Sequence, residues 1–210
     1  MVRIRLGLTT WFHPSVSIQR NDSASFEHLR NFSNRPENEV IRSGDLLHVD
    51  FGITYLRLNT DIQQHAYVLH PEETDAPVYL HNAFANSNRL QDILTDQFKT
   101  GRTGNQILKA ARANAIKENI IPSIYTHPLG LHGHAAGPTI GMWDKQEGVS
   151  GSGDYPVYPH TAYSIELNSA TYIPQWGKEI RIMLEENGYY DGQAFKYIAG
   201  RQKKLRLISY

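Results

Sequence analysis

Two aspartates lie inside stretches of this chain that otherwise have the composition of β-strands. Residues 44–56, GDLLHVDFGITYL, and residues 61–69, DIQQHAYVL, are rich in Val, Ile, Leu, Phe and Tyr, as the two arms of a β-hairpin are. The separation 61 − 50 = 11 places Asp50 and Asp61 opposite each other around a turn at Tyr55–Leu56. Neither residue of that turn favours a positive φ. We therefore expect two carboxylates on one face of a hairpin.

Two facing carboxylates repel each other unless they share a proton or hold a cation between them. A divalent cation is the simpler explanation if further hard ligands come from elsewhere in the chain. Glu166 lies in the middle of the apolar stretch SIEL, and Glu179 begins KEIRIML on the face opposite its isoleucines. Glu179 could equally belong to a solvated strand face. His134, in GHAAG, adds an imidazole, and one imidazole with four carboxylates suits a pair of Mn, Co, Fe or Zn ions.

The composition limits the class of protein. A chain of 210 residues, 40% hydrophobic, can build one substantial core, so we expect a single domain over residues 1–210. The 21 basic and 21 acidic side chains balance, which argues against nucleic acid or a membrane surface as the main partner. There is no cysteine to form disulfides or thiolate metal sites. We expect no membrane-spanning segment, no secretory signal and a cytoplasmic location.

The remaining patterns predict a mixed α and β fold. Helices are expected over residues 82–98 and 103–120, the second with Thr103 and Gln106 in capping-box spacing and Pro122 at its end. Residues 127–144 and 147–156 are rich in glycine and lack periodicity, as loops do. Residues 161–173 and 179–187 alternate between polar and apolar side chains, which predicts strands.

The order of these residues resembles the pita-bread metallopeptidases, a family that includes methionine aminopeptidase, aminopeptidase P and prolidase. Its pattern is two aspartates eleven apart on a hairpin, a histidine in a G-H-x-x-G segment, and two glutamates on late strands. The spacing 179 − 166 = 13 is similar to that of the prolidase branch. Glu179 is preferred to Glu185 and Glu186, which are assigned to an acidic turn after the strand. The resemblance extends from about Trp11 to about Gly192.

The resemblance implies an α+β pita-bread fold and a metallo-aminopeptidase or dipeptidase with two divalent ions, manganese being favoured over cobalt, zinc and iron. It implies hydrolysis by a hydroxide that bridges the ions, with Glu166 also passing a proton to the leaving amine. The implied substrate is an Xaa-Pro peptide or dipeptide. The implied metal ligands are Asp50, Asp61, His134, Glu166 and Glu179.

Three features depart from the family pattern. Family members have helices or a whole domain before the segment TWFHPSV, so we expect a truncated chain or a partner, such as the second copy in a homodimer, that supplies the missing part. The family has another histidine seven residues after its metal histidine, but 134 + 7 = 141 is Gly141. His127 and His132 are the candidates to replace that catalytic histidine.

The residues that would contact the substrate follow the pattern less closely. A histidine upstream of the hairpin contacts the substrate in the family, and His28 and His13 both compete for that role. Trp143 could form a wall of the substrate pocket or be part of the core.

Other functions fit the same fold. A pita-bread protein can serve as a binding module after losing its metal ligands, or act without metal as an amidinohydrolase resembling creatinase. All five ligand positions are present here, which disfavours both. An incomplete fragment of a larger peptidase remains a third alternative.

Overall fold

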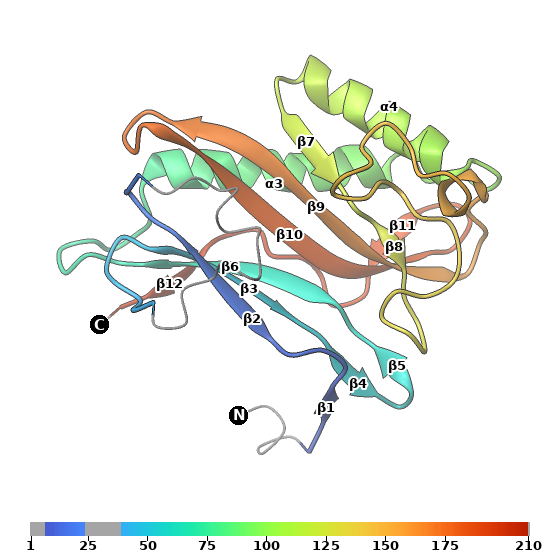
Figure 1. The fold of residues 1–210 in the computed structure, drawn as a ribbon, viewed down its shortest axis with the longest axis horizontal. Coiled ribbons are helices and arrows are strands. Elements are labelled where there is room, and N and C mark those ends of the chain that lie inside the picture. Colours follow the sequence, from blue (N-terminus) through green and yellow to red (C-terminus); the bar gives the residue numbers. More distant parts are fainter. Residues whose placement is uncertain (1–6, 24–38, 210) are drawn as a thin grey trace.

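The protein, as a computed structural model, is described over residues 7–23 and 39–209. In these residues two helices cover one face of a large, mostly antiparallel sheet (Figure 1). The helices are α3 (Val78–Thr95) and α4 (Gly104–Lys117), with a 3-10 turn η2 (Ser152–Asp154). The strands are β1 (Thr9–Thr10), β2 (Ser15–Gln19), β3 (Leu46–Phe51), β4 (Ile53–Tyr55), β5 (Leu58–Asn59), β6 (Ile62–Val68), β7 (Ile121–Ile124), β8 (His127–Pro128), β9 (Thr161–Ile173), β10 (Lys178–Tyr190), β11 (Phe195–Tyr197) and β12 (Arg206–Ile208).

The large sheet has the strand order β2-β3-β6-β10-β9-β7, with β8, β11 and β12 pairing beside β9, β10 and β6. The two predicted late strands form its longest hairpin, in which β9 and β10 stay paired from Thr161↔Tyr190 to Ile173↔Lys178. A separate small sheet joins β1, β4 and β5. The predicted mixture of helices and strands is confirmed. Within the described ranges, no helix combines the length and the apolarity needed to cross a bilayer.

Both predicted helices form, with shifted ends. In α4 the capping box is present, because Gln106 N–H donates to Thr103 Oγ1 at 3.2 Å and Thr103 N–H donates to Gln106 Oε1 at 3.0 Å. This helix ends at Lys117, where Asn119 soon follows in the left-handed region with φ of 59°. Pro122 therefore does not end the helix but lies in β7.

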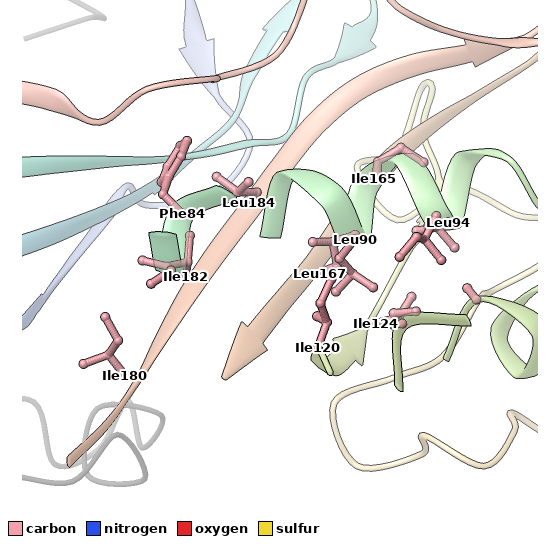
Figure 2. Packing of buried hydrophobic residues seen from close by; sticks show 14 of the residues in the cluster. Phe84, Leu90, Leu94, Ile120, Ile124, Ile165, Leu167, Ile180, Ile182 and Leu184 are labelled. Atoms are coloured by element: carbon pink, nitrogen blue, oxygen red, sulfur yellow. The ribbon is translucent and has the colours of Figure 1, made fainter. Parts of the chain in front are cut away.

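The apolar face of the sheet forms the core with α3 (Figure 2). Leu80, Phe84, Leu90 and Leu94 recur at helical spacing and are buried. On β9 and β10 the side chains alternate between the two faces, and the middle of the face toward the helix is mostly apolar. Its apolar side chains include Ile165, Leu167, Ile180, Ile182 and Leu184. The other face of the same strands is therefore the one that can carry polar chemistry.

The early hairpin forms with a different register from the one predicted. Its turn residues are Leu56 and Arg57, both at positive φ, and Tyr55 pairs with Leu58. Asp50 consequently pairs with Gln63, and Asp61 lies two residues before Gln63. The two aspartates are thus diagonal neighbours on one face rather than directly opposite each other.

The sheet divides along β6. Its first part meets β10 at the pair Glu185↔Gln63, whereas its last part pairs in parallel with β12. Side chains fill the resulting seam: the amide of Gln202 donates to His65 O at 2.7 Å and accepts from His65 N–H at 2.8 Å. The polar end of this seam is where the candidate site lies.

Candidate metal centre

Five side chains lie in one row across five strands of the large sheet. The register pairs Ser15 with Asp50, Asp50 with Gln63, Gln63 with Glu185, and Glu185 with Glu166. Directly paired residues point to the same face of a sheet. Three carboxylates and an amide from β3, β6, β10 and β9 are therefore brought together by strand pairing alone. Asp61 adds a fourth carboxylate from the same face of the hairpin.

Glu185, rather than Glu179, joins this group, so the expected position of the last glutamate was wrong. Both lie on the same face of β10, but 185 − 179 = 6 residues separate them, or roughly 20 Å along a strand. Glu179 is exposed and forms an ion pair with Arg181 at 3.2 Å. The stretch around Glu185 and Glu186 is not a turn, because β10 continues through it to Tyr190.

His127 has its imidazole inside the carboxylate cluster. Its Nε2 lies 3.6 Å from Glu185 Oε1, 3.7 Å from Asp61 Oδ2 and 3.9 Å from Glu166 Oε2. In the described part of the chain this buried nitrogen has no hydrogen-bond partner. The other ring nitrogen, Nδ1, lies 3.1 Å from Pro128 O and donates to it, which leaves Nε2 with a free lone pair.

His134 lies beside His127, nearer the solvent, with the ring centroids 4.2 Å apart. Its Nδ1 is 3.2 Å from the hydroxyl of Tyr125. The spacing 134 − 127 = 7 is the spacing expected between a metal histidine and its following histidine. If His127 is the metal histidine, then His134 is the histidine that follows it by seven residues, and the chain no longer departs from the family pattern at Gly141.

These groups form three overlapping sets whose ligand atoms lie within 4.8 Å of one another. The sets are Asp50 with Asp61 and Glu185, His127 with Glu166 and Glu185, and Asp61 with His127 and His134. Because Asp61, Glu185 and His127 each belong to two sets, neighbouring cation positions would share ligands.

Burial makes this cluster electrostatically unfavourable on its own. The pKa of Asp61 is raised by desolvation first, and then by the charges of Glu185 and Asp50. Desolvation and the same neighbouring carboxylates also raise the pKa of Glu166 well above its usual range. Desolvation and the nearby ring of His127 lower the pKa of His134. Among the described residues, no Lys or Arg forms an ion pair with Asp61, Glu166 or Glu185.

Divalent cations fit this arrangement. A bare, buried imidazole nitrogen that faces several carboxylate oxygens is the donor set that Mn, Fe, Co or Zn takes. A pocket of about 210 Å³ opens onto the carboxylates. That is room for two cations and several waters, since a water in the liquid occupies about 30 Å³.

Aromatic side chains form the walls of the pocket: Trp11, Phe12, Tyr125 and Trp143. Trp143 is half-buried among these lining residues, and its contact with substrate stays a prediction. The indole of Trp11 donates from Nε1 to Thr60 O at 2.7 Å. A Cβ on Gly133 would lie 2.2 Å from Trp11 Cη2, so only glycine lets the loop approach this ring. Trp11, Phe12 and Tyr125 were not singled out from the sequence, because isolated aromatic residues carry no distinguishing spacing.

The other histidines expected at the site lie elsewhere. His13 is exposed, and its ring Nδ1 lies 3.1 Å from the carbonyl oxygen of the adjacent Pro14. His132 is exposed and is neither among the lining residues nor in a ligand set, so its expected catalytic place is not supported by its position. His28 falls outside the described residues.

Comparison with known proteins places this geometry in a family. The family model described as metallopeptidase family M24 matches residues 1–186. No curated protein sequence matched the chain.

Solved structures share the fold at low sequence identity. An X-Pro aminopeptidase from Thermotoga maritima has a TM-score of 0.66 at 18% identity, over 95% of this chain and 50% of that one. A prolidase from Thermococcus sibiricus has a TM-score of 0.67 at 16% identity, over 99% and 50%. The N-terminal domain of the FACT complex subunit SPT16 from Eremothecium gossypii has 0.69 at 14%, over 97% and 43%. The chain thus spans about half the length of these structures, and the expected pita-bread fold is confirmed.

Proposed function

Since this chain belongs to metallopeptidase family M24, we propose that it is a metal-dependent peptidase acting near the N-terminus of a peptide. The observation that carries this proposal is the shared set of ligands around the bare Nε2 of His127. A fold alone does not decide function, but within the described residues no Lys or Arg pairs with the buried carboxylates of Asp61, Glu166 and Glu185, so their charges call for a cation or protons.

We assign the metal ligands to Asp50, Asp61, His127, Glu166 and Glu185. This assignment keeps three of the expected ligands, replaces Glu179 by Glu185, and exchanges the roles first given to His134 and His127. Two divalent cations would polarise the scissile carbonyl and lower the pKa of a water held between them. Manganese remains the proposed metal, as the resemblance to the family implies.

The remaining groups of the site suit proton transfer and positioning. Glu166 is a buried residue that lines the pocket, where it could accept a proton and pass it to the leaving amine. Burial lowers the pKa of His134, and its Nδ1 lies 3.2 Å from the Tyr125 hydroxyl; if that hydroxyl donates to Nδ1, the neutral ring carries its hydrogen on Nε2. That N–H could stabilise the developing oxyanion, because a fixed donor at developing charge contributes about 3 kcal/mol.

The proposed substrate is an Xaa-Pro peptide or dipeptide. The aromatic walls support it, because flat rings pack well against the pyrrolidine ring of proline. The names of the similar solved structures, an X-Pro aminopeptidase and a prolidase, point in the same direction. Hydrolysis of Xaa-Pro peptides, with a matched Xaa-Ala series as control, tests this choice.

The metal assignment is tested with two glutamates of one strand. The chain and the variants Glu185→Gln and Glu179→Gln are loaded with Mn²⁺, desalted and analysed for metal content. We expect two ions per chain in the wild type and in Glu179→Gln, and a loss of at least one ion in Glu185→Gln. A wild type without bound metal would overturn the proposal and favour a binding module. Metal loss in Glu179→Gln alone would restore the first assignment.

A further inference from the structure

Gln63 lies between the carboxylate cluster and a series of polar side chains that continues along the same face of the sheet, through β3 to β2. Its amide nitrogen donates to Glu166 Oε1 at 2.8 Å and to Glu185 Oε2 at 2.7 Å. Gln63 is 4% exposed, so water has little access to these bonds. Both N–H groups of the amide are thus used by two proposed ligands on neighbouring strands.

In both Glu166 and Glu185, the two carboxylate oxygens have different neighbours. The oxygens that accept from Gln63 are Glu166 Oε1 and Glu185 Oε2, whereas Glu166 Oε2 and Glu185 Oε1 are the oxygens nearest His127 Nε2. One oxygen of each group is therefore held by the amide, and the other is directed toward the proposed cation positions.

The orientation of the Gln63 amide is set by its hydrogen bond with His48 on the neighbouring strand β3. Because its nitrogen faces two carboxylates, its carbonyl oxygen must face His48, whose Nε2 lies 2.8 Å away. His48 then donates from Nε2, and its Nδ1 accepts from the hydroxyl of Ser17 at 3.2 Å. His48 and Ser17 are buried as well. In this series of hydrogen bonds, from Ser17 through His48 to Gln63, each donor therefore lies on the side away from the carboxylates and each acceptor on the side toward them.

We infer that Gln63 is a positioning residue that fixes Glu166 and Glu185 for cation binding, with His48 and Ser17 fixing Gln63 in turn. This inference rests on the proposed metal centre. Partners of this kind typically change metal affinity by about 10–100-fold when they are removed. Residues that only fill the interior would affect stability and leave the affinity of the folded protein unchanged.

The test compares two buried glutamines. Gln63→Met keeps the length of the side chain but removes its hydrogen bonds. Gln19→Met is the matched control, because Gln19 is also 4% exposed and its amide bonds to the backbone of Arg181, donating at 2.7 Å and accepting at 2.8 Å, away from the proposed metal ligands. Calorimetric titration of the metal-free full chain with Mn²⁺ gives the stoichiometry and the dissociation constants. Circular dichroism confirms that each variant is folded.

We expect Gln63→Met to bind Mn²⁺ about 10–100-fold more weakly than wild type, and Gln19→Met to remain within about threefold of it. Equal affinities in Gln63→Met and wild type would overturn the positioning role while leaving the metal centre intact. A wild type that binds no Mn²⁺ would overturn both.

A second measurement does not depend on metal or on a variant that folds. The ¹⁵N shifts of the His48 ring in the wild-type chain report which nitrogen carries hydrogen. We expect hydrogen on Nε2, because this nitrogen faces the carbonyl oxygen of Gln63. A ring protonated on Nδ1 alone would reverse the direction of this series of hydrogen bonds and overturn the inference.

Discussion

His65 is a fully enclosed histidine in the seam between β6 and β10. Its Nε2 accepts a hydrogen bond from Met183 N–H at 2.9 Å. Burial lowers the pKa of His65 well below its usual range, and the ring of His48, 5.1 Å away between centroids, lowers it further. The imidazole is therefore neutral in the folded chain.

A neutral buried histidine makes stability depend on pH in a definite direction. The unfolded chain binds a proton at His65 near pH 6.5, whereas the folded chain does not, so this contribution is complete above that pH. It is lost as the pH falls below 6.5, by at most about 1.4 kcal/mol per pH unit. We expect His65→Gln, whose Oε1 can still accept from Met183, to lose less stability than wild type between pH 6.5 and 5.

Urea denaturation of the metal-free chain at several pH values measures this difference. The quantity compared is the slope of unfolding free energy against pH in the two proteins. The carboxylates with raised pKa values contribute equally to both slopes, so their opposite effect cancels. Parallel slopes for wild type and His65→Gln would show that the proton is bound elsewhere.

At the scale of single residues, the sequence identified Asp50, Asp61 and Glu166 correctly as members of the cluster. An acidic side chain in an apolar strand is a strong signal because burying it alone is unfavourable. Glu185 and Glu179 share one face of β10, so alternation could not separate them, and only the true length of the strand does. The seven-residue spacing of His127 and His134 was the signal that could have ranked them, because it matches the spacing expected between a metal histidine and the histidine that follows it.

At the scale of elements, the early hairpin closes through an unfavourable turn. Leu56 and Arg57 have φ of 49° and 67°, values that side chains other than Gly and Asn rarely adopt. The neighbouring loop holds the hairpin in this register, since Asn59 N–H donates to Gly130 O at 2.8 Å and Asn59 Nδ2 to Leu131 O at 3.1 Å. The sequence could not predict this register, because those contacts are more than seventy residues apart along the chain.

Replacing the turn with residues that favour it should stabilise the chain. We expect the double variant Leu56→Asn/Arg57→Gly to raise the free energy of unfolding by about 1–3 kcal/mol. Each left-handed residue other than Gly or Asn costs about 1–2 kcal/mol, and the larger entropy that Gly loses on folding offsets about 0.5–1 kcal/mol of the gain. Leu56 is 77% exposed, so its loss removes little buried surface. The control Leu56→Ala/Arg57→Ala removes the same side chains but keeps the strain. If both variants gain equally in urea denaturation, the turn geometry is not the cause.

At the scale of the whole molecule, the sheet separates stability from chemistry. Its helix-covered face carries the apolar core, and its other face carries the row of carboxylates and their buried partners. The helices and long strands were predictable because periodicity records burial. The division of the sheet at β6 was not, since it depends on side-chain amides such as Gln202 that replace strand pairing. The expected homodimer and Xaa-Pro specificity stay predictions for the full assembly.

The polar face has a consequence for the stability of the whole chain. Cations that bind only the folded state stabilise it by RT ln(1 + [L]/Kd), or about 2.7 kcal/mol at a hundredfold excess over Kd. For a domain of this size we expect Mn²⁺ to raise the melting temperature by roughly 5–10 °C. The rise should be larger at pH 8 than at pH 6, because the metal competes with protons for the same carboxylates.

Thermal melting with and without Mn²⁺, at both pH values, measures this effect. Asp61→Asn should abolish the rise, since Asp61 belongs to two of the overlapping ligand sets. Asp144→Asn is the control, because Asp144 is an exposed carboxylate next to the pocket residue Trp143 and belongs to none of the ligand sets. A rise that persists in Asp61→Asn would place the stabilising cation on the outer surface, and the row of paired carboxylates would then need another explanation.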